Sequence, residues 1–281
     1  MILIADSGST KTDWRTVDKK FNISKFQTVG LNPFFVDKKN ISKIINKTLS
    51  SKLNIEEISK IFFYGSGCSS DINSNLIKEC LEMVFNNAEV FVYTDLFGAS
   101  RALFGNNSGI VAILGTGSNS AYYDGGKITE NINSLGYILG DEGSGAYLGK
   151  KFIADFLNNE LPNNIYNKFI NEYKLTKENI LDSIYSKPFP NRFLASFTKF
   201  LFKNKDDKYV IDLLEDSFNK FFDRTICKYT DYDKQITRCV GSVAYYFEDI
   251  IRPLALKRKI NIDKIIKTPI SGLVNYHLEK F

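Results

Sequence analysis

The feature that most constrains this chain is a pair of short loops rich in glycine and hydroxyl residues, each directly after an apolar segment. Residues 6–12 (DSGSTKT) follow residues 1–5 (MILIA), and residues 115–120 (GTGSNS) follow residues 109–114 (GIVAIL). Small side chains let the backbone N–H groups of a tight turn approach an anion closely. One loop near the start and one near the middle therefore predict that a chain of phosphates is held from both sides.

Neither loop has the spacing of the other common phosphate-binding motifs. The G-x-x-x-x-G-K-[ST] pattern of P-loops and the G-x-G-x-x-G pattern of dinucleotide-binding folds are both absent from them. A single glycine-rich turn is also typical of ordinary β-hairpins. The phosphate hypothesis therefore depends on the pair.

Length, charge and hydropathy narrow the class of protein. The 281 residues are enough for two ordinary domains, and the net charge of +5 comes from scattered lysines rather than a basic block, which disfavours a nucleic-acid partner. No apolar run reaches the length of a membrane span, and Met1 leads directly into an apolar strand. We expect a cytoplasmic protein with no membrane partner.

Cysteine and histidine are poorly placed for catalysis or metal binding. The four cysteines lie far apart without a C-x-x-C pair, at Cys68, Cys80, Cys227 and Cys239, and are expected to be buried, reduced thiols. His277 is the one histidine, and we expect it to have a packing or surface role. Carboxylates are then left to do any acid–base chemistry.

The pattern of apolar residues predicts the same order of elements twice. In the first half, strands are expected over 2–5, 13–17, 23–29, 60–64 and 89–93, with helices over 39–53, 73–85 and 95–103. In the second half, strands are expected over 109–114, 119–123, 127–131, 235–240 and 263–267, with helices over 242–257 and 270–280. A largely helical insertion is expected over 144–232, with a proline-rich break at 188–190.

Two copies of a β-β-β-α-β-α-β core, each with a glycine turn between its first two strands, form the plan of the actin, Hsp70 and sugar-kinase superfamily. We therefore predict an α/β protein of two ribonuclease-H-like domains with a nucleotide cleft between them. Residues 1–105 with 269–281 would form the first domain. Residues 106–268 would form the second, which includes the helical insertion. Two unrelated α/β domains remain the alternative.

The first loop offers a metal partner and several phosphate ligands. A carboxylate among phosphate donors is repelled unless a cation lies between them, so Asp6 is interpreted as a Mg²⁺ partner acting through water. An Asx turn from Asp6 to the Gly8 N–H is the structural alternative, and both can hold. The remaining groups would serve the phosphates: Gly8, Ser9, Thr10 and Thr12, with Lys11 neutralising charge or pointing to solvent.

Asp95 is the candidate catalytic base. It follows the strand predicted over 89–93 and begins a helix, and open α/β sheets bind ligands at such strand ends. A carboxylate there can accept the proton of a sugar hydroxyl as a phosphoryl group moves. The structural alternative is a plain N-cap.

Residues 135–145 form the densest cluster, with four glycines around Asp141 and Glu142. This composition suits neither a helix interior nor a strand, so we predict a loop whose backbone approaches a ligand. The acidic pair suits sugar hydroxyls or a hydrated metal ion. Alternatively, the two acids would lie at the N-terminus of the following helix and complement its dipole.

Three further features are weaker. Gly241 and Ser242 link a strand to a helix and could meet phosphate or adenine. The turn at 65–70 could border the substrate or be a simple strand-to-helix connection. Asn32 both donates and accepts, which suits an acetamido or hydroxyl group, and Trp14 is expected in the core.

Taken together, residues 6–14, 114–120, 139–145, 241–244 and 269–273 resemble the BadF/BcrA-type ATPase and N-acetylglucosamine kinase family. The resemblance spans nearly the whole chain. It implies a two-domain ribonuclease-H-like fold and ATP-dependent phosphorylation of an amino sugar at its 6-hydroxyl.

Carried over to this sequence, the resemblance implies a base at Asp95, and metal and phosphate positions at Asp6 and the first loop. Thr116, Gly117 and Asn119 would lie in the second phosphate loop and near the sugar. Asn32, Gly136, Tyr137 and Asp141 match positions that line the sugar pocket. The animal N-acetylglucosamine kinases have tryptophan at the position of Tyr137, which puts the identity of the sugar in doubt.

Two other functions are compatible with the same family. One is an ATPase that activates a dehydratase through an iron–sulfur cluster bridging two subunits, with the four cysteines as candidate ligands. The other is a non-catalytic regulator that responds to sugar or nucleotide. The sequence is compatible with a homodimer but does not determine the oligomeric state.

Overall fold

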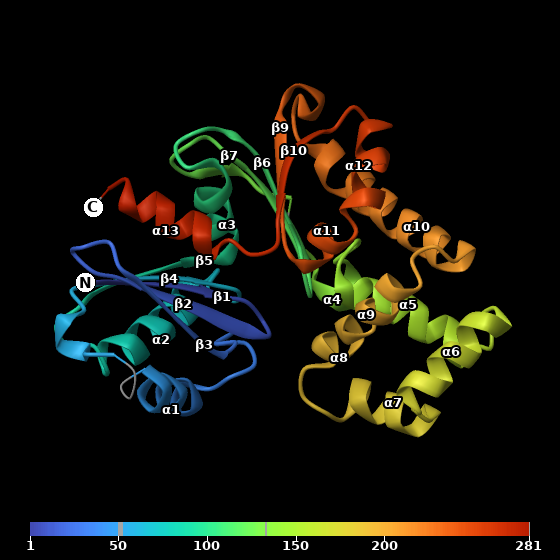
Figure 1. Cartoon of the computed structure of the whole chain (residues 1–281), viewed down its shortest axis with the longest axis horizontal. Coiled ribbons are helices and arrows are strands. Elements are labelled where there is room, and N and C mark those ends of the chain that lie inside the picture. The colour runs from blue at the N-terminus through green and yellow to red at the C-terminus, as the bar shows by residue number, and fades with distance from the viewer. Residues whose placement is uncertain (50–52, 133, 281) are drawn as a thin grey trace. The chain divides into compact units, whose positions relative to one another are not determined.

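The computed structural model describes residues 1–49, 53–132 and 134–280 and divides the chain into two compact units. The first unit comprises Met1–Asn107, Gly125–Lys127 and Thr268–Phe281, and the second comprises Ser108–Asp124 and Ile128–Lys267. Each unit is built around one five-stranded sheet (Figure 1).

The described residues of the first unit form five strands and four helices. They are β1 (Ile2–Ser7), β2 (Lys11–Val17), β3 (Ile23–Val29), α1 (Lys38–Leu49), β4 (Lys60–Gly65), α2 (Asp71–Glu82), β5 (Glu89–Thr94), α3 (Asp95–Phe104) and α13 (Ile270–Leu278), with a 3₁₀ turn at Ile55–Glu57. The strand order is β3-β2-β1-β4-β5. β1 pairs antiparallel with β2 and parallel with β4, and β4 pairs parallel with β5.

Both faces of the first sheet are covered, because β1 is apolar on both sides. Helices α1 and α2 pack on one face, around a core that includes Leu3 and Ala5. Helices α3 and α13 cover the other face, against Ile2 and Ile4 (Figure 1). Trp14 is fully buried, as the sequence predicts.

The second unit repeats this sheet and adds helices. It contains β6 (Gly109–Leu114), β7 (Ser118–Tyr123), β8 (Ile128–Glu130), α4 (Gly136–Leu139), α5 (Gly145–Leu157), α6 (Asn163–Tyr173), α7 (Lys177–Tyr185), α8 (Pro190–Ser196), α9 (Thr198–Lys203), α10 (Lys208–Arg224), β9 (Ile236–Val240), α11 (Ser242–Tyr246), α12 (Glu248–Leu256) and β10 (Asn261–Ile266), with 3₁₀ turns at Ile226–Lys228 and Tyr232–Lys234. The order β10-β9-β6-β7-β8 matches that of the first sheet, with β6 in the place of β1. The predicted α/β fold with duplicated sheets is confirmed.

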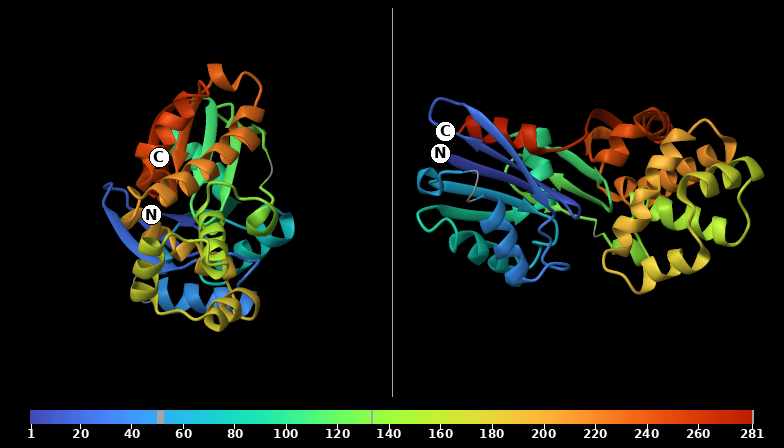
Figure 2. Two further views of the ribbon diagram at one scale, coloured as in Figure 1. Left: turned by 90° about the vertical axis from the view of Figure 1, so that its right-hand side faces the viewer. Right: turned by 60° about the horizontal axis from the view of Figure 1, so that its bottom comes forward.

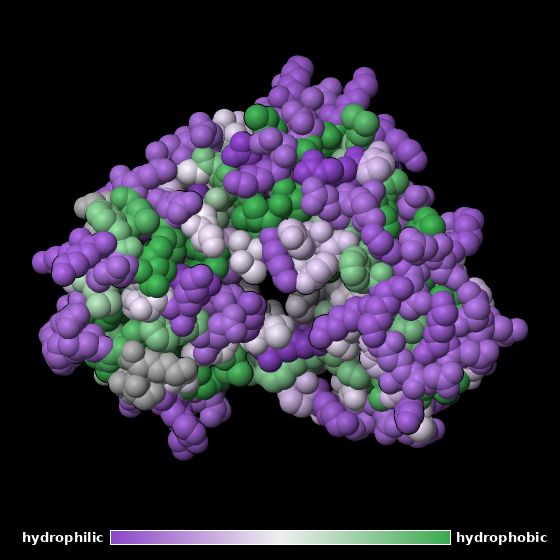
Figure 3. All heavy atoms as spheres, in the orientation of Figure 1, coloured by the Kyte–Doolittle hydropathy of each residue, from purple (hydrophilic) through white to green (hydrophobic). Residues whose placement is uncertain are grey.

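Helices α5–α10 form the predicted insertion and gather at one end of the second unit (Figure 2). Their core is rich in phenylalanine: Phe152 and Phe169 meet edge to face with ring centroids 5.0 Å apart. Phe218, Phe221 and Phe222 are also buried. The outer surface over these helices is mostly hydrophilic in the view of Figure 3.

Two predicted elements are wrong. The helix expected over 242–257 is two helices, because Phe247 is buried with a non-helical backbone (φ −108°, ψ 24°) between α11 and α12. The loop expected over 135–145 contains the four-residue helix α4, which Gly136 can begin because it adopts a positive φ of 73°. Elsewhere the predicted helix ends differ by a few residues, and the predicted end of the first helix, at 53, would carry it through residues 50–52, outside the described ones.

The remaining expectations about single residues are largely confirmed. All four cysteines are free, and three of them are buried, whereas Cys227 is half-buried. In the part of the chain that the structure describes, no helix is both long and apolar enough to cross a membrane.

His277 has a packing role. Its ring stacks on Phe62 with centroids 3.9 Å apart, and its Nε2 lies 2.9 Å from the hydroxyl of Tyr64. Tyr64 also accepts a hydrogen bond of 2.8 Å from Arg101 on α3, so these side chains join α13, β4 and α3. Burial, with the positive charges of Arg101 and Lys280, lowers the pKa of His277 to about 4.

We expect His277 to make stability depend on pH. The unfolded chain binds a proton near the ordinary histidine pKa of 6.5, whereas the folded protein resists it down to about 4. The stability contributed by neutral His277 is therefore complete above pH 6.5 and declines as the pH falls. Between pH 7 and 5, urea unfolding should show that the wild type loses about 1–2 kcal/mol more than His277→Gln. Equal losses in the two proteins would contradict this assignment.

Candidate functional site

The parallel strands of the first sheet end together and place several polar residues at one edge. Ser7 of β1 is paired with Gly65 of β4, which is paired with Thr94 of β5. The connections that leave these three strands therefore start side by side. Ligands bind at such carboxyl ends in open α/β sheets.

Asp95 lies at this edge as the first residue of α3. Its Oδ1 accepts a hydrogen bond of 2.9 Å from the backbone N–H of Leu96. The N-cap is Thr94, whose hydroxyl accepts from the Phe97 N–H, so the interpretation of Asp95 as a plain N-cap is wrong. Burial raises the pKa of Asp95 above its ordinary value, against the opposing effect of the Leu96 bond. Asp95 therefore accepts one N–H of the first helical turn but is not the N-cap.

Asp6 lies near Asp95, and its carboxyl group is buried among other negative charges. Burial, followed by the negative charges of Asp13 and Asp95, raises the pKa of Asp6 to about 7. No described residue donates a hydrogen bond to the Asp6 carboxylate. The Asx-turn alternative is wrong, because the Gly8 N–H donates to Lys11 O at 3.0 Å. Oxygen ligands under mutual repulsion suit a hard divalent cation, so these residues fit Mg²⁺.

In the first hairpin, some polar side chains bond to other residues of the fold, and others have no partner among the described residues. Thr12 is buried, with its hydroxyl 2.8 Å from that of Ser7 and 3.2 Å from Val29 O. Lys11 forms an ion pair of 2.7 Å with Asp13. The hydroxyls of Ser9 and Thr10 have no partner among the described residues, so this part of the loop can meet a ligand.

Asn32 and the turn at 65–70 lie against the same hairpin. Asn32 is buried, and its side chain donates to Ser66 Oγ at 3.3 Å. The Ser66 N–H in turn donates to Ser7 O at 2.8 Å. Cys68 on this turn is close enough to Asp95 for that carboxylate, after burial, to help raise the pKa of Cys68 to about 12. The turn therefore borders Asp95, which the sequence left open.

The second hairpin is hydrogen-bonded to the end of the acidic segment and the start of α5. Gly145 N–H donates to Gly115 O at 2.8 Å, and Ala146 N–H donates to Thr116 O at 2.9 Å. An added Cβ on Gly117 would lie 2.8 Å from Asp141 Oδ2, so a larger residue would displace that carboxylate.

Asp141 faces the hairpin rather than the helix that follows. It has a positive φ of 58° and accepts hydrogen bonds from Ser134 Oγ at 2.6 Å and from the Ser118 N–H. Burial raises its pKa despite these bonds. Helix α5 begins at Gly145 with Ser144 as its N-cap and has no acid in its first turn, so the helix-dipole alternative is wrong.

A cavity of about 110 Å³ opens beside Asp141. It is lined by Ser118, Asn119, Ile132, Ser134, Leu135, Leu139, Asp141, Glu142, Arg224 and Thr225. The predicted residues Asn119 and Asp141 therefore meet. Sequence reasoning missed Arg224, which pairs with Glu142, because 82 positions separate the two and no local pattern links them.

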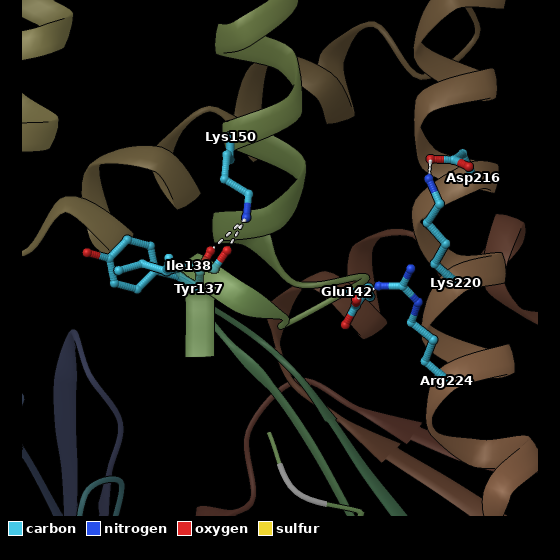
Figure 4. A network of polar contacts seen from close by, with 7 residues as sticks. All are labelled: Tyr137, Ile138, Glu142, Lys150, Asp216, Lys220 and Arg224. Carbon is cyan, nitrogen blue, oxygen red and sulfur yellow. Dashed lines mark hydrogen bonds and ion pairs between the residues drawn. The ribbon is translucent and has the colours of Figure 1, made fainter. Parts of the chain in front are cut away.

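Gly136 and Tyr137 do not line this cavity. Figure 4 shows the ring of Tyr137 on the side away from Glu142 and Arg224. Lys150 fixes the short helix by donating to Tyr137 O at 2.8 Å and to Ile138 O at 3.2 Å.

Gly241 brings the start of α11 against the second hairpin. Its φ is 129°, and an added Cβ would overlap Leu114 O. Next to it, Ser242 lines a mainly apolar cavity of about 410 Å³ between α9 and α11. The other lining residues are Thr198, Lys199, Phe202, Lys203, Val243, Tyr246 and Phe247. The sequence did not predict this cavity.

Residues 1–49, 53–132 and 134–280 hold no group of three or more histidines, cysteines or acids that could bind a metal ion directly. A Mg²⁺ partner at Asp6 would therefore act with water and phosphate as further ligands.

We expect the first hairpin to depend on a close approach at Gly30. An added Cβ there would lie 2.6 Å from Ser9 O, so the loop would have to move. Gly30→Ala should lower the free energy of unfolding in urea by about 2 kcal/mol. Gly8→Ala is the matched control, because its nearest neighbour would be at 3.7 Å. Equal stabilities of the two variants would show that the loop has room at Gly30.

No protein-family model matches the chain, and a search of curated proteins found no match. Among solved structures, a protein from Porphyromonas gingivalis is 38% identical, with 99% of each chain covered and a TM-score of 0.94. One from Chromobacterium violaceum is 16% identical, with 98% of each chain covered and a TM-score of 0.74. Both are described as putative N-acetylglucosamine kinases.

A more distant structure has the same fold. It is a ROK family glucokinase from Streptomyces griseus in complex with glucose and AMPPNP, 14% identical, with a TM-score of 0.56 over 98% of this chain and 97% of that one. The fold is that of the actin-like ATPases and sugar kinases. The identity and coverage of the Porphyromonas gingivalis protein show that this chain belongs to the N-acetylglucosamine kinase family.

Proposed function

We propose that this protein is an ATP-dependent kinase that phosphorylates an amino sugar, N-acetylglucosamine, at its 6-hydroxyl. The observation that carries the proposal is the position of Asp95, a carboxylate with a raised pKa at the carboxyl edge of the first sheet, where Thr94 and not Asp95 is the N-cap. The 38% identity to a protein described as a kinase of this sugar supports the same substrate.

Asp95 would act as the general base. Burial raises its pKa, so the carboxylate gains basicity for the sugar hydroxyl whose oxygen attacks the terminal phosphate. The turn that contains Cys68, together with Asn32, would hold the sugar beside it. Catalysis in phosphoryl transfer comes mainly from positioning and charge stabilisation.

ATP would be bound by the two hairpins and by the start of α11. Gly8, Ser9 and Thr10 would contact phosphate in the first unit, and Thr116 and Gly117 in the second. Thr12 and Lys11 would act indirectly, since one is bonded to Ser7 and the other to Asp13. The apolar cavity beside Gly241 and Ser242 has aromatic side chains suited to a purine base.

Mg²⁺ would be held near Asp6 through water. When bound, the ion supplies positive charge that offsets the phosphates. Asp6 itself would be kept ionised by that ion, against the repulsion of Asp13 and Asp95. The sugar would be contacted by Asn32, Asn119 and Asp141, with Gly136 and Tyr137 on the adjacent short helix.

We expect purified protein with Mg²⁺ and ATP to release ADP when N-acetylglucosamine is added. Glucosamine, glucose and N-acetylmuramic acid, tested in the same coupled assay, should give lower kcat/KM values. The position of the phosphate in the product can be read by NMR. Turnover independent of any sugar, or protein that contains iron after anaerobic purification, would instead favour the dehydratase-activating ATPase. Nucleotide and sugar binding without turnover would favour the regulator.

Asp95→Asn should lower kcat by about 10²- to 10⁴-fold, because the amide cannot accept the proton. Nucleotide affinity, measured by calorimetry, should be unchanged. Asp71→Asn is the matched control: Asp71 is also the first residue of a helix behind a hydroxyl N-cap, but it is exposed. Full turnover by Asp95→Asn would rule out the proposed base.

A further inference from the structure

The cavity beside Asp141 has an arginine at its edge that comes from the helical insertion. Arg224 is the last residue of α10, and its Nη1 pairs with Glu142 Oε1. The Arg224 side chain remains 62% exposed, whereas that of Glu142 is 11% exposed. Figure 4 shows the guanidinium directed at the Glu142 carboxylate. The ion pair thus fixes a cationic donor at a cavity already lined by Asn119 and Asp141.

Some of the polar groups around this cavity are donors without a partner among the described residues. Asn119 Oδ1 accepts from the Ser120 N–H at 2.9 Å, but no described residue accepts a hydrogen bond from its Nδ2. Nε and Nη2 of Arg224 likewise have no acceptor in the described part of the chain. Asp141 accepts from Ser134 and the Ser118 N–H, and Glu142 accepts from Arg224, although each carboxylate can accept further hydrogen bonds. A ligand group that fits here must bring an oxygen acceptor.

Part of the cavity wall is apolar, and the space is small. Ile132, Leu135 and Leu139 line the cavity together with the polar groups. The volume of about 110 Å³ exceeds what a single water needs and suits a substituent of a few heavy atoms. An acylamino group matches both requirements, because its carbonyl accepts hydrogen bonds and its methyl group is apolar.

We propose that this cavity receives the acylamino substituent of the sugar and that Arg224 is a residue that selects it, by donating, together with Asn119, to the carbonyl oxygen. The inference rests on the proposed function and adds a specificity determinant to it. A free ammonium group could pair with the acids but would leave the donors of Arg224 and Asn119 without an acceptor and the apolar residues uncovered. A hydroxyl would leave the apolar walls uncovered. A carboxylate would face Asp141 and Glu142.

The test compares Arg224→Met with wild type. Methionine keeps an apolar stem and removes the donors. Calorimetry should show affinity for N-acetylglucosamine falling by about 10- to 100-fold, the range expected when a charged donor is lost from a polar contact. Glucose has no acyl group, so its dissociation constant should be the same for both proteins. If glucose does not bind the wild type, it should produce no binding heat with either protein. ADP affinity should be unchanged and reports that the variant is folded.

Lys220→Met is the matched control, because Lys220 also pairs with an acid on α10, one turn before Arg224, but does not line the cavity. It should bind N-acetylglucosamine like the wild type. Asn119→Asp exchanges the donor for an acceptor and should lower the affinity for the acylated sugar as Arg224→Met does. Arg224→Met with wild-type affinity for N-acetylglucosamine would overturn the inference and leave the kinase proposal standing. A wild type that neither binds nor phosphorylates any sugar would overturn the proposed function itself.

Discussion

The structure depends on one constraint that appears in both units: a central strand that is buried on both faces. Ile2–Ala5 in β1 and Ile110–Ala112 with Leu114 in β6 are almost fully covered. Each fully buried aliphatic side chain contributes about 1.5–3 kcal/mol, so these strands must lie in the middle of a sheet with helices on both sides. Each pairs antiparallel with its hairpin partner and parallel with the next strand of the fold. The hairpin turn and the strand-to-helix turns consequently open at the same edge.

Carboxylates are buried at that edge, although buried negative charges lower the stability of a core. Asp6 and Asp95 come from different strand ends, and burial and mutual repulsion raise the pKa of Asp6 to about 7. Such an arrangement is unfavourable unless a ligand offsets it, which is why perturbed carboxylates mark functional sites. The scaffold behind them is held by buried contacts: those of Arg101, Tyr64 and His277 join α3 to β4 and α13. In the second unit, the bonds from Ser134, Lys150 and Arg224 fix the glycine-rich segment around Asp141 in the same way.

The sequence anticipated what depends on local pattern. Apolar runs predicted all ten strands, and glycine with hydroxyl residues predicted both hairpins. Its errors came where tertiary packing overrides propensity. The buried side chain of Phe247 interrupts a continuous helical pattern, and Lys150 stabilises a short helix within a segment whose glycines favour a loop. Thr12 matched a phosphate-binding pattern, but its hydroxyl is bonded to Ser7 in the core, a distinction that no spacing of residues reveals.

The sequence by itself determined the alternation of strands and helices, the duplicated order and the identity of the acids available for chemistry, because periodicity and residue type are local properties. Only the tertiary structure decided which of these groups have partners. Ser9 and Thr10 remain available to a ligand, whereas Lys11 is paired with Asp13. Arg224 meets Glu142 across 82 positions because α10 ends beside the acidic segment, and that long-range approach is set by the packing of the helical insertion.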